Sequence, residues 1–199
     1  MEMSLLKNER IINKCDKDDL HFLTKDQREE YQLGYDHRAV TIQHKRIDQY
    51  KRWTDDNGKP YYTFTFVRNP WQRLVSEYFY IKKMKGCLCD DFESKYPTFK
   101  DFVKNDGLSC SYLTHDTSQI DFVLSSNHGR LTNFVGRCED MQYDFDYVCG
   151  KLGLPKIELP KRNPTKHKHY TEYYDDETRH LVERMFVRDI EYFGYEFGI

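Results

Sequence analysis

Apolar and polar residues change their spacing abruptly along FTFVRNPWQRLVSEYFY, the stretch that runs from Phe64 to Tyr80. The segment Tyr61–Val67 is rich in aromatic and β-branched residues and lies between two prolines, which predicts a strand. Pro70 suits the first turn of a helix, because its φ angle is fixed and its missing N–H is not needed there. The next apolar residues recur at helical spacing: Leu74, Val75, Tyr78, Phe79 and Ile81. The stretch therefore predicts a strand, a tight turn and a helix.

The same patterns predict further elements along the chain. Predicted helices cover residues 3–12, Phe99–Val103, Met141–Leu152 (closed by Gly153 and Pro155) and a last helix that begins near Asp175 or Asp176, turns Leu181, Val182, Met185, Phe186 and Ile190 inward and ends before Gly194. Leu131–Val135 is predicted to be a strand. Gln119–Leu124 is an apolar segment whose secondary structure the pattern does not decide. Residues 15–60 are polar and predict short helices and loops.

Strands that alternate with helices predict an α/β fold with a mainly parallel sheet. The 199 residues are enough for one domain, which we expect to span residues 1–199. In open sheets of this kind ligands bind at the carboxyl ends of the strands. Candidate chemistry is therefore sought where predicted strands end.

Composition narrows the partners of the chain. The net charge of −2 gives no global field that attracts nucleic acid or an anionic membrane. No apolar run reaches the roughly 20 residues of a membrane span, so we expect no membrane segment in this chain and a cytoplasmic location. Six cysteines form neither a disulfide framework nor a zinc spacing, so we expect reduced thiols and no metal. Cys149 falls on the apolar face of its predicted helix and is expected in the core.

Two anion-binding side chains follow the first predicted strand. Arg68 stands at its carboxyl end, and Arg73 and Ser76 share one face of the next helix because they are three residues apart. The helix would also direct its free N–H groups and the positive end of its dipole at this place. These donors suit a phosphate. The residues alone leave a purely structural explanation equally open. Arg68 could pair with a buried carboxylate, and Ser76 could simply pack against the sheet.

The run FVRNPWQRLVSEYFY resembles the 3′-phosphate-binding segment of sulfotransferases that use 3′-phosphoadenosine-5′-phosphosulfate (PAPS), most closely the carbohydrate-type family called sulfotransferase family 2. Further elements of that family follow in order, as HDTSQ (115–119), NFVGRCED (133–140), YDFDYVCGKLGLP (143–155) and a closing LPKRNPTKHKHYTEYYDDETRHLVERMFVRDIEYFGYEF pattern in which Thr165 replaces the usual Ser. The resemblance covers roughly residues 60–198 and is carried by five elements in the right order.

The resemblance implies a P-loop-NTPase-like fold and transfer of a sulfuryl group from PAPS to a hydroxyl of a carbohydrate acceptor. Arg68 and Ser76 are the implied ligands of the 3′-phosphate. Arg73, Arg137 and Asn163 are secondary candidates for binding the co-substrate.

The acceptor hydroxyl must lose a proton, so a base is needed. His37, His44 and His115 are the candidate catalytic residues, with Glu139 as a competing carboxylate. Glu139 could instead form a structural ion pair with Arg137. The basic cluster Lys161–Tyr170 could be a solvated loop or a loop that closes over the nucleotide or an anionic glycan.

One element of the family has no counterpart in the sequence. The loop P-K-x-x-x-[ST]-S, which holds the 5′-phosphosulfate, does not occur, and MEMSLLKNER looks like the helix that would follow it. We therefore expect the first strand and the phosphate loop to be missing from this chain. A non-catalytic module that binds a nucleotide or glycan is one alternative. A nucleotide-kinase-like protein is another, disfavoured because no G-x-x-x-x-G-K-[ST] occurs. If an N-terminal segment is missing, a Golgi or membrane-anchored location replaces the cytoplasmic one.

Overall fold

A computed structural model of the chain describes residues 61–83, 91–110, 117–124, 132–160 and 167–199. The helix predicted for residues 3–12 lies outside these ranges. So do four of the candidate site residues: His37, His44, His115 and Asn163.

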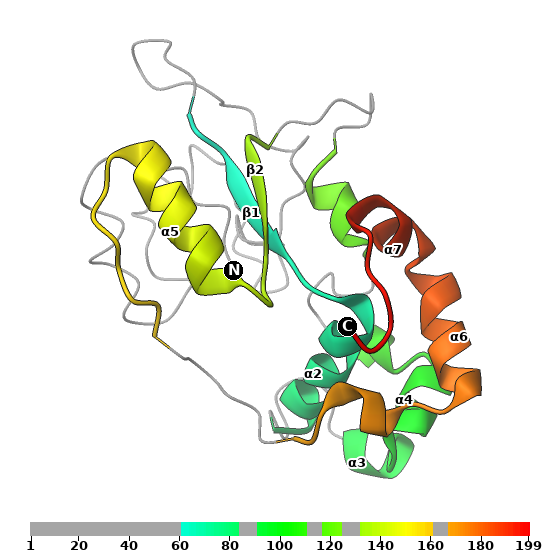
Figure 1. Cartoon of the computed structure of the whole chain (residues 1–199). Coiled ribbons are helices and arrows are strands. Elements are labelled where there is room, and N and C mark those ends of the chain that lie inside the picture. The colour runs from blue at the N-terminus through cyan, green and yellow to red at the C-terminus, as the bar shows by residue number, and fades with distance from the viewer. Residues whose placement is uncertain (1–60, 84–90, 111–116, 125–131, 161–166) are drawn as a thin grey trace, which may run out of the picture.

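The described elements alternate between helices and short strands (Figure 1). In chain order they are β1 (Phe64–Val67), α2 (Pro70–Lys83), α3 (Phe92–Lys95), α4 (Phe99–Lys104), η3 (Gly107–Cys110), η4 (Gln119–Phe122), β2 (Phe134–Arg137), α5 (Met141–Leu152), η5 (Tyr170–Tyr173), α6 (Asp176–Met185) and α7 (Val187–Phe193), where η marks a 3₁₀ helix. The predicted helices that begin at Pro70, Phe99 and Met141 are confirmed, and the predicted strand Tyr61–Val67 is confirmed over its last four residues, as β1.

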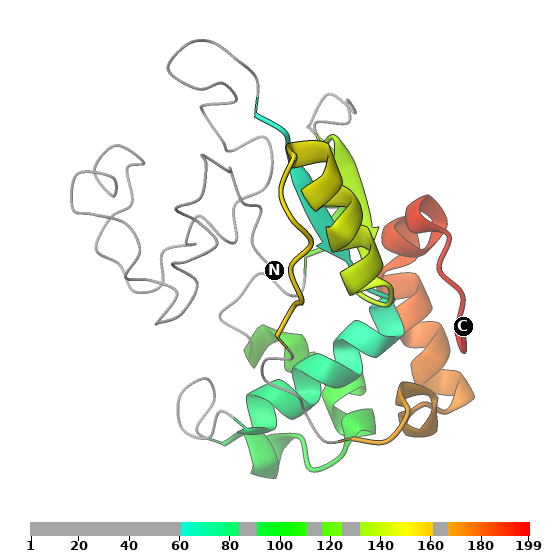
Figure 2. The same ribbon diagram turned by 60° about the vertical axis from the view of Figure 1, so that its left-hand side comes forward.

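Strands β1 and β2 pair in parallel, with Phe64 opposite Phe134 and Val67 opposite Arg137. The predicted parallel pairing is thus confirmed for the two strands in the described part of the chain. Helix α5 packs on one face of this sheet, and α7 lies beside the other (Figures 1 and 2). Both strands therefore end at the same edge, next to the start of α2.

The close packing of α5 on the sheet depends on one glycine. Phe66, Phe134 and Gly136 face α5, and Phe134 packs on Tyr147 with 4.9 Å between the ring centroids. A Cβ atom at Gly136 would lie 2.7 Å from the Phe66 ring and 3.0 Å from Cβ of Asp144. Glycine is the residue that admits this approach.

Strand β2 lies further along the chain than predicted, at Phe134–Arg137 instead of Leu131–Val135. The reason is Asn133, whose Oδ1 accepts hydrogen bonds from the backbone N–H of Thr63 at 2.8 Å and from its hydroxyl at 3.0 Å. The carbonyl of Thr63 also accepts from the backbone N–H groups of Asn133 and Phe134, at 2.8 and 3.2 Å, so side-chain and backbone bonds together join the two segments just before the strands.

The last predicted helix is wrong as a single element, because it divides at Phe186 into α6 and α7. Phe186 has φ −118° and ψ 28°, outside the helical range, and its ring is buried. Met185 was predicted to point inward but is 42% exposed, whereas Asp189 is fully buried. The change of direction points the Asp189 carboxylate into the protein interior. There it accepts hydrogen bonds from the backbone N–H groups of Gln119 and Ile120, which account for the division of the helix.

Aromatic rings fill much of the core, as the composition of 16 Tyr and 13 Phe suggests. Tyr78 of α2 contacts the rings of Phe92, Phe99 and Phe102 at centroid distances of 5.4 to 5.8 Å. These contacts fasten α2 to α3 and α4, so the helix that carries the candidate site is rigidly supported. Cys149 of α5 is buried, as predicted.

Candidate anion site at the carboxyl ends of the strands

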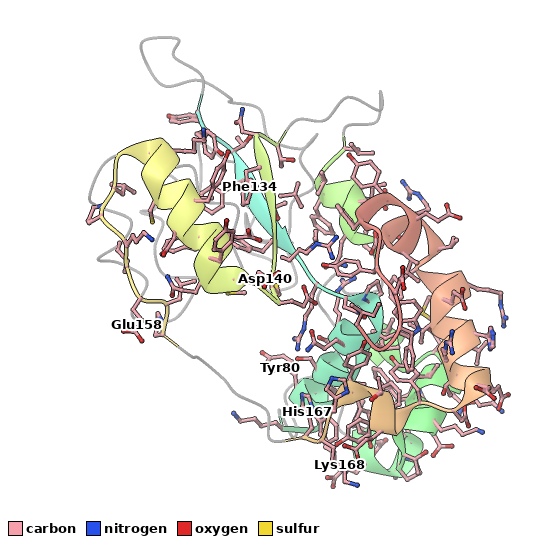
Figure 3. The ribbon with its side chains drawn as sticks, in the orientation of Figure 1. Tyr80, Phe134, Asp140, Glu158, His167 and Lys168 are labelled. Atoms are coloured by element: carbon pink, nitrogen blue, oxygen red, sulfur yellow. The ribbon has the colours of Figure 1, made fainter. Side chains whose placement is uncertain are left out.

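Arg68 is the first residue after β1, at the edge where both strands end and α2 begins (Figure 1). At the same edge β2 is followed by a turn that contains Asp140 and leads into α5 (Figure 3). Side chains from two strand ends and one helix therefore meet here, as expected for a ligand site of an α/β sheet.

The backbone of Arg68 is held by the side chain of one residue, Gln119. The N–H of Arg68 donates to Oε1 of Gln119 at 2.9 Å, and Nε2 of Gln119 donates to the carbonyl of Arg68 at 2.8 Å. The side-chain amide thus pairs with Arg68 as a neighbouring strand would. The backbone N–H and carbonyl of Arg68 are therefore both satisfied, and the backbone position from which its side chain extends is fixed.

The guanidinium of Arg68 lies along α2. Its Nε donates to Oε1 of Gln72 at 3.0 Å, and Gln72 is four residues before Ser76 on the same helix face. These three side chains are neither buried nor fully exposed. In the described part of the chain Nη1 and Nη2 of Arg68 and the hydroxyl of Ser76 have no hydrogen-bond partner, and no carboxylate pairs with Arg68. A fork of donors and a hydroxyl therefore remain available on one stripe.

Arg73 lies on the neighbouring face of α2 and contacts other groups. Its Nη1 and Nη2 donate to the carbonyl of Thr117 at 3.2 and 3.3 Å, and its guanidinium lies 5.6 Å from the centre of the Phe186 ring. Arg73 thus ties α2 to the segment that carries Gln119. Its predicted part in binding the co-substrate stays a prediction.

The predicted free N–H groups at the start of α2 are not free, and that part of the prediction is wrong. Oδ1 of Asn69 accepts from the N–H groups of Trp71 and Gln72 at 3.1 and 3.3 Å. The carbonyl of Asn69 accepts from the N–H of Arg73 at 2.8 Å. Pro70 has no N–H at all. Asparagine caps the helix, so an anion at this edge must be bound by side chains.

Arg137 is the last residue of β2 and Glu139 lies two residues later, and both contact Tyr195 near the end of the chain. Nη2 of Arg137 donates to the carbonyl of Phe193 at 2.6 Å, and its guanidinium lies 4.8 Å from the centre of the Tyr195 ring. Glu139 accepts the N–H of Asn69 at 2.7 Å and the hydroxyl of Tyr195 at 3.4 Å. Among the described residues no direct ion pair joins Arg137 to Glu139; Tyr195 stands between them.

Cys138 reports the electrostatic character of the edge. Its N–H donates to the carbonyl of Val67 at 2.8 Å, which places it beside the start of Arg68. Burial raises the pKa of the Cys138 thiol, while the positive charges of Arg68 and Arg73 act to lower it. The negative charge of Glu139 acts in the opposite sense to the two guanidiniums, and the pKa of the thiol stays above its ordinary value.

The described end of the basic cluster packs on the C-terminal half of α2 (Figure 3). The His167 ring stacks on Phe79 with centroids 5.3 Å apart and an angle of 16° between the ring planes. The N–H of Lys168 donates to the Tyr173 hydroxyl at 3.0 Å, and Tyr170 is buried. This end of the cluster is thus part of the packed structure and not a freely solvated loop.

Two further properties bear on cofactors and location. Within the described ranges no three or more His, Cys, Asp or Glu side chains gather as metal ligands would. No described helix has the length and apolar character needed to span a membrane.

Sequence reasoning did not assign a role to Gln72, Gln119 or Asp189. Gln72 could have been found from its spacing, since it stands four residues from both Arg68 and Ser76. Gln119 belongs to the HDTSQ element, but a residue that binds the backbone of another segment leaves no periodic signal. Asp189 lies in the closing pattern of the family resemblance, but its burial depends on the division of the last helix at Phe186, which helical spacing does not predict.

Comparisons with known proteins agree with these motifs. The model of the sulfotransferase family (sulfotransferase family 2) matches residues 9–196. An uncharacterized protein of Archaeoglobus fulgidus is 31% identical over 97 residues, which are 48% of this chain and 71% of that protein. No solved structure matches the chain.

Proposed function

The chain belongs to the sulfotransferase family, and from this premise we propose that it moves a sulfuryl group from PAPS to a hydroxyl of a carbohydrate acceptor. The observation that carries the proposal is a set of donors beside α2, here called the α2 stripe: the two terminal nitrogens of Arg68 and the hydroxyl of Ser76 lack partners in the described part of the chain. Gln72, which bonds Arg68, stands about one turn before Ser76 on the helix. We assign the 3′-phosphate of the nucleotide to this stripe.

The chemistry of a phosphate fits these donors. A guanidinium offers parallel N–H groups that match two phosphate oxygens, and a hydroxyl can donate to a third. Gln72 accepts from Nε of Arg68, which leaves the outer side of the guanidinium toward the ligand. Because the N–H groups of α2 are already capped by Asn69, the affinity for the phosphate must come mainly from Arg68.

Sulfuryl transfer requires an in-line attack of the acceptor hydroxyl on sulfur, with 3′-phosphoadenosine 5′-phosphate (PAP) as the leaving group. The residues at the strand ends would hold the nucleotide in place for this attack. His37, His44 and His115 stay the proposed candidates for the base that takes the proton from the hydroxyl. Asn163 stays a proposed contact of the nucleotide. Glu139 is less suited to act as the base, because both of its oxygens accept hydrogen bonds from the protein.

We further propose that the full sheet follows the P-loop-NTPase-like order that the family resemblance implies. The parallel β1 and β2, with α5 and α7 on opposite sides, are compatible with it. A sugar hydroxyl is proposed as the acceptor on the resemblance alone.

Titration calorimetry with PAP tests the nucleotide assignment, and sulfate transfer from labelled PAPS to a panel of glycans tests the reaction. We expect saturable binding of PAP and weaker binding of adenosine 5′-phosphate, which lacks the 3′-phosphate. Equal affinity for both nucleotides would contradict the role of Arg68 and Ser76. Binding of PAP without transfer to any glycan would instead support a module that binds the nucleotide but does not catalyse the reaction.

A further inference from the structure

Asp189 is a carboxylate with no exposed surface, although carboxylates are rarely buried so completely. Its Oδ2 accepts the backbone N–H of Gln119 at 2.8 Å, and its Oδ1 accepts the N–H of Ile120 at 2.9 Å. It therefore caps the beginning of η4 from a different part of the chain, 70 residues away. Helix α7 and the segment that precedes the candidate site are joined through this one side chain.

The same carboxylate also sets the orientation of the Gln119 side chain. Oδ2 of Asp189 lies 3.5 Å from Nε2 of Gln119, the nitrogen that donates to the carbonyl of Arg68. An ionised carboxylate only accepts hydrogen bonds, so it favours the amide orientation that turns the nitrogen toward it. The oxygen of Gln119 then faces the N–H of Arg68. With the amide turned over, its oxygen would oppose both Asp189 and the carbonyl of Arg68.

A second contact holds the same segment against the site. Arg73 of α2 donates to the carbonyl of Thr117, and its guanidinium lies over Phe186, the residue at which the last helix divides. The division gives α7 its own direction and lets Asp189 reach η4. A continuous helix through residue 186 would not place the carboxylate in the same way. The break therefore brings Asp189 to the segment that holds Arg68.

We propose that Asp189 is a positioning residue for the nucleotide site, acting through the Gln119 amide on the backbone of Arg68. The inference rests on the proposed function, because it takes Arg68 as the ligand of the 3′-phosphate. It adds that residues of the last helix, which do not reach the phosphate, set how well Arg68 binds it. A hydrogen-bonded chain of three residues thus couples α7 to the end of β1.

The structure offers a matched control. Arg188 and Asp121 also join α7 to η4, through a surface ion pair of 2.8 Å, but this pair has no bond to Arg68. If α7 served only to hold η4 in place, loss of either link would change the candidate site in proportion to the strength of that link. If Asp189 acts through Gln119, only the Asp189 link alters the site.

The experiment compares the full chain with four variants: Asp189→Asn, Gln119→Ala, the double variant and Arg188→Ala. Two quantities are measured, the Kd for PAP by calorimetry and the hydrogen-exchange rate of the Arg68 amide by NMR, well below each melting temperature. Asp189→Asn puts an NH₂ group against at least one N–H donor, so we expect Kd to rise about tenfold and the Arg68 amide to exchange faster. Gln119→Ala should have at least the same effect.

The double variant decides whether Asp189 acts through Gln119. Its Kd and its Arg68 exchange rate should equal those of Gln119→Ala within about twofold, because coupled residues are not additive. Additive losses would overturn the inference, as would an Asp189→Asn protein with native exchange at Arg68. Arg188→Ala should match the native chain in both quantities, and an equal loss there would overturn it too.

Two arrangements keep the test decisive. If Asp189→Asn does not fold, Gln119→Glu replaces it, because a carboxylate at that position faces the carbonyl of Arg68 and should raise both quantities beyond the Gln119→Ala values. If the native chain does not bind PAP, the proposed function fails. The exchange rate of the Arg68 amide still supports or overturns the link from Asp189, since it requires no nucleotide.

Discussion

The two parallel strands end at the same edge, where Arg68 follows β1 and Arg137 is the last residue of β2, yet the two arginines have different surroundings. After β1, the Arg68 backbone is bracketed by Gln119 while Nη1 and Nη2 of its guanidinium lack partners in the described part of the chain. At the end of β2, Nη2 of Arg137 donates to the carbonyl of Phe193, and its guanidinium lies on the ring of Tyr195. Arg68 has a fixed backbone and two terminal nitrogens without partners in the described residues, whereas Arg137 uses one terminal nitrogen to hold the C-terminal segment.

This difference shows that position at a strand end is not enough to assign a binding role. The β2 end contacts the C-terminal segment through Tyr195, and Glu139 from the same end accepts the N–H of Asn69 at the start of α2. We infer that the β2 end holds the edge together so that the β1 end can bind. Variants at both strand ends test this division of roles.

Arg68→Ala should have the largest effect on nucleotide binding. It removes the only charged donor with available nitrogens on the described α2 stripe, so we expect a loss on the order of 2–4 kcal/mol in PAP binding. The melting temperature should change little, because the side chain has a single hydrogen bond, to Gln72. Calorimetry and thermal unfolding measure the two quantities on the same samples.

Two controls sharpen that result. Arg68→Lys keeps the charge but loses the forked geometry and should fall between the native chain and Arg68→Ala. Arg188→Ala removes a surface arginine paired with Asp121 and should leave PAP affinity unchanged. Native affinity in Arg68→Ala would falsify the assignment of the 3′-phosphate to β1.

Arg137→Ala should show the opposite pattern, with a loss of stability and little change in PAP affinity. The variant loses the 2.6 Å bond to the carbonyl of Phe193 and the contact with the Tyr195 ring, together roughly 1–2 kcal/mol of unfolding free energy. Denaturant unfolding beside calorimetry checks both. A large loss of affinity without loss of stability would break the comparison and return Arg137 to the nucleotide site that the sequence resemblance implied.

Ser76→Ala should weaken PAP binding by about 1 kcal/mol, the usual size of one hydrogen bond, and should not harm α2 because alanine favours helices. The matched control is Ser94→Ala on α3, where the hydroxyl bonds only the carbonyl of Asp91. If both variants bind PAP like the native chain, the α2 stripe contributes its arginine alone, and the β1 end is simpler than proposed.

Much of the fold around the site could be predicted because it depends on local patterns. The change from alternating to helical spacing after Val67 located β1 and α2, and Gly153, with its positive φ of 68°, ends α5 as predicted. Arg68 at the strand end followed from the same reasoning. These features need only the properties of neighbouring residues.

The features that sequence reasoning missed depend on contacts between distant segments. The division at Phe186 is favoured by the bonds of Asp189 to Gln119 and Ile120, which no helical pattern encodes. Asn69 caps α2 with its own side chain, and asparagine is among the preferred capping residues, so the N–H groups expected to face a phosphate are already satisfied. The ion pair that was left open as an alternative role for Glu139 is absent from the described residues, where Tyr195 contacts both Arg137 and Glu139.

Tyr195→Phe should change the unfolding free energy least of these variants at neutral pH. Its effect should be measurable only in alkaline solution. Burial, and next the negative charge of Glu139, raise the pKa of the Tyr195 phenol above its ordinary value, against the opposing charge of Arg137. A raised folded-state pKa means that the phenol adds stability in full below the unfolded pKa of about 10. That contribution is lost as pH rises through the folded-state value, because the unfolded chain then binds fewer protons.

Unfolding free energies of the native chain and of Tyr195→Phe, measured from about pH 8 to about pH 11, check this prediction. The native chain should lose stability more steeply above about pH 10, by at most about 1.4 kcal/mol per pH unit for the one extra proton. Tyr78 and Tyr174, whose pKa values burial also raises, are common to both proteins, so the difference between the curves isolates Tyr195. Parallel curves would mean that Tyr195 ionises as freely in the folded chain as in the unfolded one. The β2 end would then lack the buried phenol that sets it apart from the β1 end.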